Sequence, residues 1–337
     1  MAIRISIIIP IYNAASTLQT AVESILAQEF EEMELLLVDD GSTDNTPSIC
    51  HQLSRLDTRI RVISQKNAGI CAARNRGLSV ARGDYITFCD DDDTFLPGAL
   101  QRLYETAERE QADIVRGNYQ LYREGPDGEF REQKHEPGMI CRMWQEGYAA
   151  FLQKSGPQFV WNALYRRQIL EGVRFDERCR YGLEDFIFNM TLYAKTDRAV
   201  YLPDNVYRHY EGAQSTSVCQ TTQALRARIG ALGPWMEAEH SAIQSRCPES
   251  ERGKVWALRR AEAITFLMHQ LRDANAPAAL RRYAWRTLRK ILSGYSAYAL
   301  DFWQGTGQNK KKTAALLLYQ LRMQGLYDLF TSKQCRK

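Results

Sequence analysis

The sequence has no long hydrophobic run. None of its 337 residues falls in a segment that approaches the roughly 18 consecutive apolar residues needed to cross a bilayer. The short apolar run Ile7 to Ile9 ends at once at Pro10 and has no small-residue cleavage site after it, so it predicts a strand and not a signal peptide. We therefore expect a globular protein on the cytoplasmic side of the membrane.

Paired cysteines and nucleotide-binding glycine loops are missing as well. The eight cysteines are scattered, with no C-x-x-C pair and no zinc-like spacing, which argues against a disulfide framework or a zinc module. No G-x-G-x-x-G or Walker sequence occurs, which weighs against a dinucleotide oxidoreductase and a P-loop NTPase.

Net charge is unevenly distributed along the chain, with the positive excess late. The net charge is +4, yet from residue 220 onward roughly 20 Lys and Arg stand against about 8 Asp and Glu. Such a basic region suits an anionic membrane surface, or it is the solvated face or dimer contact of a packed helical subdomain. Nucleic acid is disfavoured because no recognised reading motif accompanies the charge. The basic residues considered are Arg281, Arg282, Arg286, Arg289, Lys290 and Lys310 to Lys312.

Strand and helix patterns alternate through the first hundred residues, which predicts an α/β fold with parallel strands and crossover helices. The expected strands are 5–9, 34–38, 61–64 and 85–89. Ser16 and Gln19 form an S-x-x-Q pattern that predicts a capping box, and Gly83 is expected to end a helix in a left-handed conformation. A hairpin or loop is expected over 124–138, and helices over 255–271, 280–292 and 313–329.

Polar residues follow three of the expected strands. They are Tyr12 and Asn13, Asp39 and Asp40, and the run Asp90 to Asp93. Because ligands in open α/β sheets bind beyond the carboxyl ends of the strands, we expect the three clusters to converge.

Four consecutive carboxylates at the end of a buried strand repel one another unless a cation or hydrogen-bond donors neutralise them. Oxygen ligands suit Mg²⁺ or Mn²⁺, which take much of their coordination shell from phosphates and water. The run therefore indicates a metal–diphosphate site, with a polar turn that caps a helix as the alternative.

Six motifs stand in a family order: I-I-I-P-I-Y-N (7–13), V-D-D-G-S-T-D (38–44), N-x-G followed by A-R-N-x-G (67–77), G-D-Y-I-T-F-C-D-D-D-D (83–93), W-N-A-L-Y (161–165) and E-D (184–185). Over roughly residues 3 to 217 the chain resembles an inverting family 2 glycosyltransferase of the GT-A fold. The resemblance implies a catalytic domain over 1–218, and a helical C-terminal region over 219–337 remains.

The resemblance also implies a UDP-sugar site. Tyr12 would stack on uracil beside Pro10, Asp39 would accept the imide N–H, and Arg74 would face the donor phosphates. Alternatively, Tyr12 is a core aromatic and Asp39 a ligand of a helix dipole. The nucleotide-sugar residues implied are Pro10, Tyr12, Asp39, Asn67, Arg74, Asp90 and Asp91.

Chemical roles follow from the same resemblance. Asp185 would be the base that deprotonates the acceptor hydroxyl, assisted by Glu184, unless both acids only begin a helix. Asp92 is the expected metal ligand, although Asp91 stands where many relatives carry Ser or Ala, which blurs the division of labour. His209 would join Asp92 on Mn²⁺ or Mg²⁺ or contact the diphosphate, or it is a structural or surface residue. Trp161 and Asn162 would support the acceptor, or only pack, and Ser215 and Ser217 would close over the donor.

The expected activity is therefore metal-dependent, inverting transfer of a sugar from UDP to a cell-surface glycan or lipid-linked acceptor. A nucleotidyltransferase with a similar metal site and a catalytically silent nucleotide-sugar-binding protein are the alternatives. The basic C-terminal helices suggest peripheral attachment at the inner face of the cell membrane. Whether the chain forms a homo-oligomer stays open.

Overall fold

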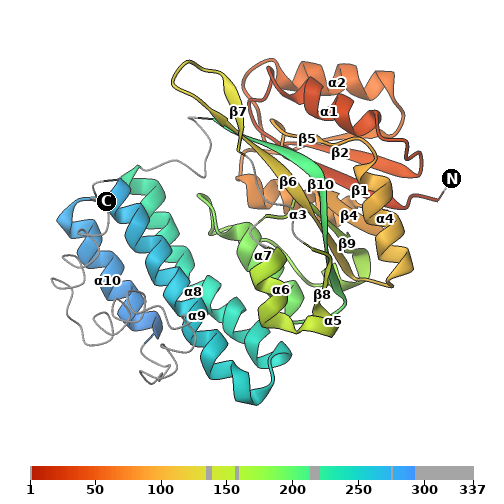
Figure 1. Ribbon diagram of the computed structural model, residues 1–337. Helices are drawn as coiled ribbons and strands as arrows, with labels where there is room; N and C mark the ends of the chain where they lie inside the picture. The colour runs from red at the N-terminus through yellow and green to blue at the C-terminus, as the bar shows by residue number, and fades with distance from the viewer. Residues whose placement is uncertain (1, 134–138, 156–158, 213–220, 275, 293–337) are drawn as a thin grey trace. The chain divides into compact units, whose positions relative to one another are not determined.

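The computed structural model describes residues 2–133, 139–155, 159–212, 221–274 and 276–292 (Figure 1). Backbone proximity divides the chain into two compact units, Met1–Cys219 and Gln220–Lys337. Each unit is considered by itself below.

A mixed sheet forms the centre of the first unit. Its strand order is β3-β2-β1-β4-β9-β6-β10-β5, with β7 paired to β6 and β8 paired to β10. The pairs β3-β2, β2-β1, β1-β4 and β6-β10 are parallel, which confirms the predicted α/β class. The strands are β1 Ile5–Ile11, β2 Met33–Asp39, β3 Ile60–Ser64, β4 Tyr85–Phe88, β5 Thr94–Phe95, β6 Ile114–Glu124, β7 Phe130–Gln133, β8 Cys141–Arg142, β9 Ala163–Arg166 and β10 Ala199–Glu211.

Helices accompany this sheet. Every residue of β1 and β2 is buried, as a continuous apolar run predicts for parallel strands that are covered on both faces. The antiparallel pair β6-β7 is the expected hairpin; residues 134–138 lie outside the described residues. The helices are α1 Leu18–Leu26, α2 Thr46–Leu56, α3 Ile70–Val80, α4 Ala99–Arg109, α5 Met143–Glu146, α6 Tyr148–Ser155, the 3-10 turn η1 Arg167–Leu170 and α7 Glu184–Tyr193.

Two local predictions are wrong. The N-cap of α1 is Thr17, which makes no side-chain cap bond, so Ser16 and Gln19 form no capping box. Helix α3 ends at Val80, and the next residue is extended, so Gly83 does not terminate it. A Cβ on Gly83 would lie 2.5 Å from the backbone nitrogen of Ser6, so glycine is needed there for close approach of β1.

The second unit is helical where it is described, as predicted. Its helices are α8 Thr222–Arg246, α9 Glu249–Asp273 and α10 Ala278–Leu292. Glu239 of α8 is fully buried and pairs with Arg259 of α9 at 2.9 Å, so a compensated charge lies inside this helical packing. The expected helix 313–329 and Lys310 to Lys312 lie outside the described residues. In the part of the chain that is described, no helix is long and apolar enough to cross a membrane.

Candidate active site

The loops that follow β1, β2 and β4 meet at one edge of the sheet. The backbone N–H of Tyr12 donates to Asp91 Oδ2 at 3.1 Å, which joins the first loop to the aspartate run. Asn13 N–H donates to Ser42 Oγ at 3.0 Å, and Asn13 Oδ1 accepts from Thr43 N–H at 2.8 Å. The expected convergence of the three polar clusters is confirmed.

The loop after β3 is tied to the same edge. Asp40 Oδ1 accepts from the N–H of Ala68 at 2.9 Å, and its Oδ2 accepts from the N–H of Gly69 at 2.7 Å. Gly41 has a φ of 74°, and a Cβ on it would lie 2.8 Å from the backbone nitrogen of Asn67. The exposed Asn67 is therefore fixed beside the β2 loop by a position that only glycine fits.

The residues expected to bind uracil differ in exposure. The side chain of Tyr12 is 50% exposed, which excludes the core-aromatic alternative, and Pro10 is buried in β1 just before it. Asp39 is buried, and its Oδ1 accepts from Ser42 N–H at 3.0 Å. Its Oδ2 has no hydrogen-bond partner among the described residues, so it can accept one from a ligand.

The four aspartates have four different environments. Asp90 accepts from a buried arginine, and Asp91 accepts from a backbone N–H. Asp92 is exposed, whereas Asp93 is fully buried. None of them caps α4, which begins at Ala99 after a left-handed glycine, so the helix-cap alternative fails.

Negative charge accumulates along this run. Burial, opposed by the N–H of Tyr12 and assisted by Asp90 and Asp93, raises the pKa of Asp91 to about 7. Desolvation and repulsion from Asp93, Asp90 and Asp91 raise the pKa of Asp92 to about 8, although solvent reaches its side chain. Ionising these carboxyls without a cation is therefore costly, and a bound cation would offset that cost.

His209 lies beside the run on β10. Its Nδ1 is 2.8 Å from Asp93 Oδ2, and its ring stacks on Trp161 with centroids 5.1 Å apart. Burial lowers the pKa of His209, but the hydrogen bond and charge of Asp93 outweigh burial and raise that pKa to about 9. Asp93 therefore holds the imidazole firmly through Nδ1.

Trp161 is 1% exposed, and both faces of its ring are covered. Phe159 stacks on it at 4.5 Å and 18°, and Tyr207 stacks on it at 4.5 Å and 15°. The structure therefore favours the packing alternative, since no ring face is left for a sugar. The half-buried aromatic at this place is Phe159, which the sequence prediction missed.

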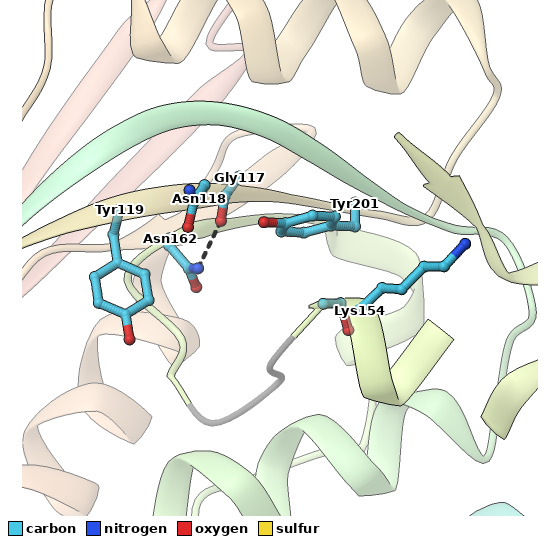
Figure 2. A pocket seen from close by; sticks show the side chains of 7 residues that line it. Gly117, Asn118, Tyr119, Lys154, Asn162 and Tyr201 are labelled. Atoms are coloured by element: carbon cyan, nitrogen blue, oxygen red, sulfur yellow. Dashed lines mark hydrogen bonds between the residues drawn. The ribbon is translucent and has the colours of Figure 1, made fainter. Parts of the chain in front are cut away.

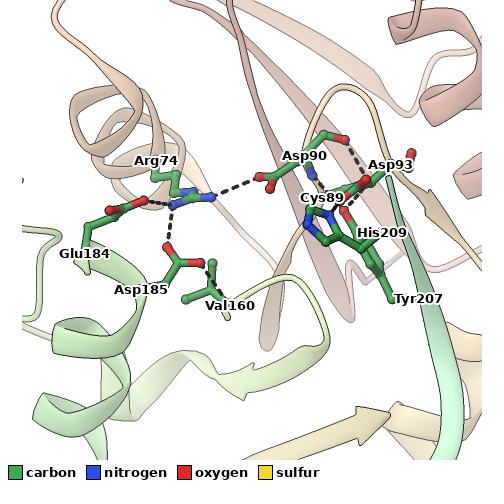
Figure 3. Close-up of polar contacts among 9 residues, drawn as sticks. All are labelled: Arg74, Cys89, Asp90, Asp93, Val160, Glu184, Asp185, Tyr207 and His209. Atoms are coloured by element: carbon green, nitrogen blue, oxygen red, sulfur yellow. Dashed lines mark hydrogen bonds and ion pairs between the residues drawn. The ribbon is translucent and has the colours of Figure 1, made fainter. Parts of the chain in front are cut away.

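Arg74 joins the aspartate run to the E-D pair (Figure 3). Its Nη2 donates to Asp90 Oδ1 at 2.9 Å, its Nη1 donates to Asp185 Oδ1 at 2.5 Å, and Nη1 lies 3.5 Å from Glu184 Oε1. Burial alone would lower the pKa of Arg74, but the charges of the three carboxylates outweigh burial and raise that pKa above its ordinary value. The guanidinium therefore stays charged. Because Arg74 is 1% exposed and both terminal nitrogens meet carboxylates, the expectation that it faces the donor phosphates needs revision.

The E-D pair occupies the first turn of α7, behind Leu183 in a left-handed conformation. Asp185 is 8% exposed, and its Oδ2 accepts from Val160 N–H at 3.1 Å. Burial raises the pKa of Asp185 to about 7 against the opposing charge of Arg74. Burial also raises the pKa of Glu184, whose buried Oε2 has no hydrogen-bond partner among the described residues. Both acids begin α7, as the helix-start alternative has it, and both also face the guanidinium of Arg74.

A small pocket lies beyond Asn162 (Figure 2). Asn162 is buried; its Nδ2 donates to Gly117 O at 2.7 Å, and its Oδ1 accepts from Arg116 Nη1 at 2.6 Å. Arg116 Nη1 also donates to Phe159 O at 2.5 Å, which connects the pocket wall to the residue next to Val160. The pocket has a volume of about 120 Å³ and is lined by Gly117, Asn118, Tyr119, Lys154, Ser155, Asn162 and Tyr201.

Comparison with known proteins decides the family. A family model described as glycosyl transferase family 2 matches residues 6–174, half of the chain. EpsJ of Bacillus subtilis (strain 168), described as an uncharacterized glycosyltransferase, is 34% identical over 221 residues, which are 63% of this chain and 62% of EpsJ. The GalNAc(5)-diNAcBac-PP-undecaprenol beta-1,3-glucosyltransferase of Campylobacter jejuni is 30% identical over 232 residues, 68% of this chain and 72% of that protein. The chain belongs to glycosyl transferase family 2.

A solved structure shows the same fold. S. aureus TarS 1-349 in complex with UDP-GlcNAc matches with a TM-score of 0.75 over 98% of this chain and 91% of that chain, at 17% identity. The likeness confirms the predicted GT-A-like α/β fold with a helical C-terminal part. The alignment of this chain with EpsJ spans less than two thirds of EpsJ, 62% of its length.

Several residues of the family 2 site were not found from the sequence. The Tyr207 hydroxyl accepts from Asp90 N–H at 2.9 Å. Val160 holds Asp185 through its backbone N–H, and Asp93 holds His209 through Nδ1. Only Asp93 had a sequence signal, its place in the aspartate run. Ser215 and Ser217, expected to close over the donor, lie outside the described residues.

Proposed function

We propose that this family 2 chain transfers a sugar from a UDP-sugar to a hydroxyl of a cell-surface glycan or lipid-linked acceptor, with inversion and with a divalent metal. The observation that carries the proposal is the bridge made by Arg74 between Asp90 and Asp185. It puts a donor-side carboxylate and a buried, basic carboxylate on the same guanidinium. A transferase needs these two functions adjacent, because the base must act where the donor's bond breaks.

The uridine is held by the loops after β1, β2 and β3. The exposed ring of Tyr12 stacks on uracil above Pro10, and the unpartnered Oδ2 of Asp39 accepts the imide N–H. Asn67 lies at the rim of the same edge, fixed by Gly41. The UDP-GlcNAc bound by TarS supports a uridine donor here.

Asp92 and His209 would hold the metal, with Asp91 and Asp90 toward the ribose and donor sugar. No three His, Cys, Asp or Glu side chains of the described residues form a ready-made metal cage. Two protein ligands nevertheless fit Mg²⁺ or Mn²⁺, which bind nucleotides largely through phosphates and water, and the raised pKa of Asp92 marks the uncompensated charge that a cation offsets. When bound, the ion would stabilise the charge that develops on the leaving diphosphate.

Asp185 takes the proton from the acceptor hydroxyl. Its two hydrogen bonds use one lone pair on each oxygen, so each oxygen keeps one for the acceptor. A base whose pKa is about 7 is both ionised and usefully basic near neutral pH. Arg74 holds this carboxylate in place and keeps it from losing its charge to burial, a role we assign in place of diphosphate binding. Glu184 lies 3.5 Å from the same guanidinium and would help to hold the acceptor.

The acceptor approaches along the segment from Phe159 to Asn162. The pocket beyond Asn162 is lined by amide and hydroxyl groups together with Lys154, which suits the hydroxyl groups of a sugar. The Campylobacter relative, named as acting on a PP-undecaprenol glycan, supports a lipid-linked acceptor. Helix α10 carries Arg282, Arg286 and Arg289, and with them we propose peripheral attachment to anionic lipid at the inner face of the cell membrane.

A thermal-shift screen of UDP-sugars with and without Mn²⁺ tests the proposal. We expect one UDP-sugar to raise the melting temperature only when metal is present. Release of UDP without pyrophosphate in a product assay separates a glycosyltransferase from a nucleotidyltransferase. Binding of the donor with no turnover on any glycan or lipid-linked acceptor points to the silent binding protein, and no response to any donor overturns the proposal.

A further inference from the structure

Asp93 is the one member of the aspartate run that the proposed donor and metal scheme leaves without a task. It is fully buried, and its Oδ1 accepts from Tyr210 N–H at 2.8 Å. Its Oδ2 lies 2.8 Å from Nδ1 of His209. The antiparallel pairing of β5 with β10, which sets Thr94 opposite Arg208, brings this carboxylate beside the imidazole.

The imidazole of His209 is fixed on two further sides. Its ring stacks on Trp161 at 5.1 Å and 27°, and the ring of Phe159 lies 5.9 Å away. The Nε2 atom of His209 has no hydrogen-bond partner among the described residues, while the side chain is 14% exposed. A ring that is clamped by packing and bonded through Nδ1 therefore has one nitrogen left for a ligand.

We propose that Asp93 is a positioning residue: it keeps the proton of His209 on Nδ1, so that Nε2 is the atom offered to the nucleotide diphosphate and its cation. The inference rests on the proposed function, because it assigns His209 to that ligand. A histidine that binds a metal commonly donates its other ring N–H to a carboxylate, which fixes the tautomer and raises its basicity. Asp93 acts through His209 and touches neither donor nor acceptor.

Asp93→Asn separates positioning from simple packing. The amide oxygen of the new side chain can still accept from Tyr210 N–H, so the contact of the aspartate loop with β10 persists. Its amide nitrogen, however, is a donor and must face Nδ1 of His209, which moves the proton to Nε2. The variant therefore keeps the shape of the site and removes the free ligand nitrogen.

The experiment is a calorimetric titration of UDP, in Mn²⁺ and in EDTA, on the full chain. We expect Mn²⁺ to tighten UDP binding in the wild type, and D93N to lose about tenfold or more of that gain with its affinity in EDTA unchanged. In an H209A background, D93N should cost nothing further. Glu34→Gln is the matched control. It alters a buried carboxylate that accepts from Ser6 of β1 and from Arg61 of β3, and this variant should keep the full Mn²⁺-dependent gain.

Each outcome bears on one level of the argument. A wild type without any Mn²⁺-dependent gain overturns the proposed function and this inference with it. A normal gain in D93N, or a further loss in the H209A background, overturns the inference alone. If D93N does not fold, ¹⁵N spectra of wild-type His209 with UDP and Mg²⁺ decide: a proton on Nδ1 with Nε2 bare supports the inference, and a proton on Nε2 overturns it.

Discussion

Replacing Arg74 with methionine removes the positive charge that Asp90, Glu184 and Asp185 share. Asp185 is buried and the side chain of Glu184 is 12% exposed, so the change leaves two carboxylates in a low-dielectric site without their counter-ion. Breaking a buried ion pair by removing one partner costs about 3–5 kcal/mol. Asp90, whose side chain is 23% exposed, adds less because water screens it. We expect a loss of about 3–5 kcal/mol in the free energy of unfolding at pH 8.

The pH dependence identifies the cause. Burial already raises the pKa of Asp185 to about 7, and loss of the arginine raises it further. In the folded protein, carboxyls with raised pKa values are protonated at pH 5, whereas the same carboxyls of the unfolded chain are losing their protons at that pH. The folded variant therefore buries less negative charge as the pH falls. The cost of Arg74→Met should therefore shrink to about 1–2 kcal/mol at pH 5, the remainder being lost packing.

Arg116 provides the matched control. It too is fully buried, but its partners are neutral: the carbonyl of Phe159, the amide of Asn162 and two tyrosine hydroxyls. Arg116→Met should destabilise the first unit without a rising cost between pH 5 and pH 8, because no carboxylate is left unpaired.

Urea unfolding followed by circular dichroism at both pH values measures these costs, and hydrogen exchange in α3 and α7 assigns them to the first of two units. The double variant of Arg74→Met with Asp185→Asn should recover about 1–3 kcal/mol relative to the sum of the single changes. Equal costs at pH 5 and pH 8, or the same pH slope in Arg116→Met, would refute the reasoning.

Three further predictions concern donor and base. Asp185→Asn should lower kcat by about 10²–10⁴ while UDP affinity is kept, and normal transfer by this variant would place the base elsewhere. The kcat/KM of the wild type should rise with pH to a plateau above about 7, because the base acts in its ionised form. Tyr12→Ala should weaken UDP binding by about 1–3 kcal/mol in calorimetry and Tyr12→Phe hardly at all, and equal effects would exclude stacking. Gly41→Ala and Gly128→Ala both place alanine at positive φ, but only Gly41 meets another backbone atom, at Asn67; we expect a larger loss of melting temperature and of UDP affinity for Gly41, and equal losses would contradict the close contact.

The fold of the first unit could be predicted because its strands carry their own signal. Ile5 to Ile9 is a continuous apolar run, and such runs followed by polar residues mark parallel strands that end at a ligand site. The local predictions failed where a residue distant in sequence determines the local structure. Gly83 reads as a helix terminator, but it is glycine because the backbone of Ser6 passes within contact distance. No local pattern carries that information.

The same limit applies to the aspartate run. The sequence shows that negative charge is concentrated at this strand end, but it does not show which carboxylate has which role. Asp90, Asp91 and Asp93 take their surroundings from Arg74, Tyr12 and His209, which are 16, 79 and 116 residues away in the chain. Adjacent residues at a turn point in different directions, so spacing alone cannot rank them. A carboxylate with a saturated set of donors is poorly suited to bind a cation, whereas an exposed one with repelling neighbours is well suited. For that reason Asp92 remains the metal ligand proposed from the motif. The partners of Asp93 indicate that it supports the other proposed metal ligand, His209.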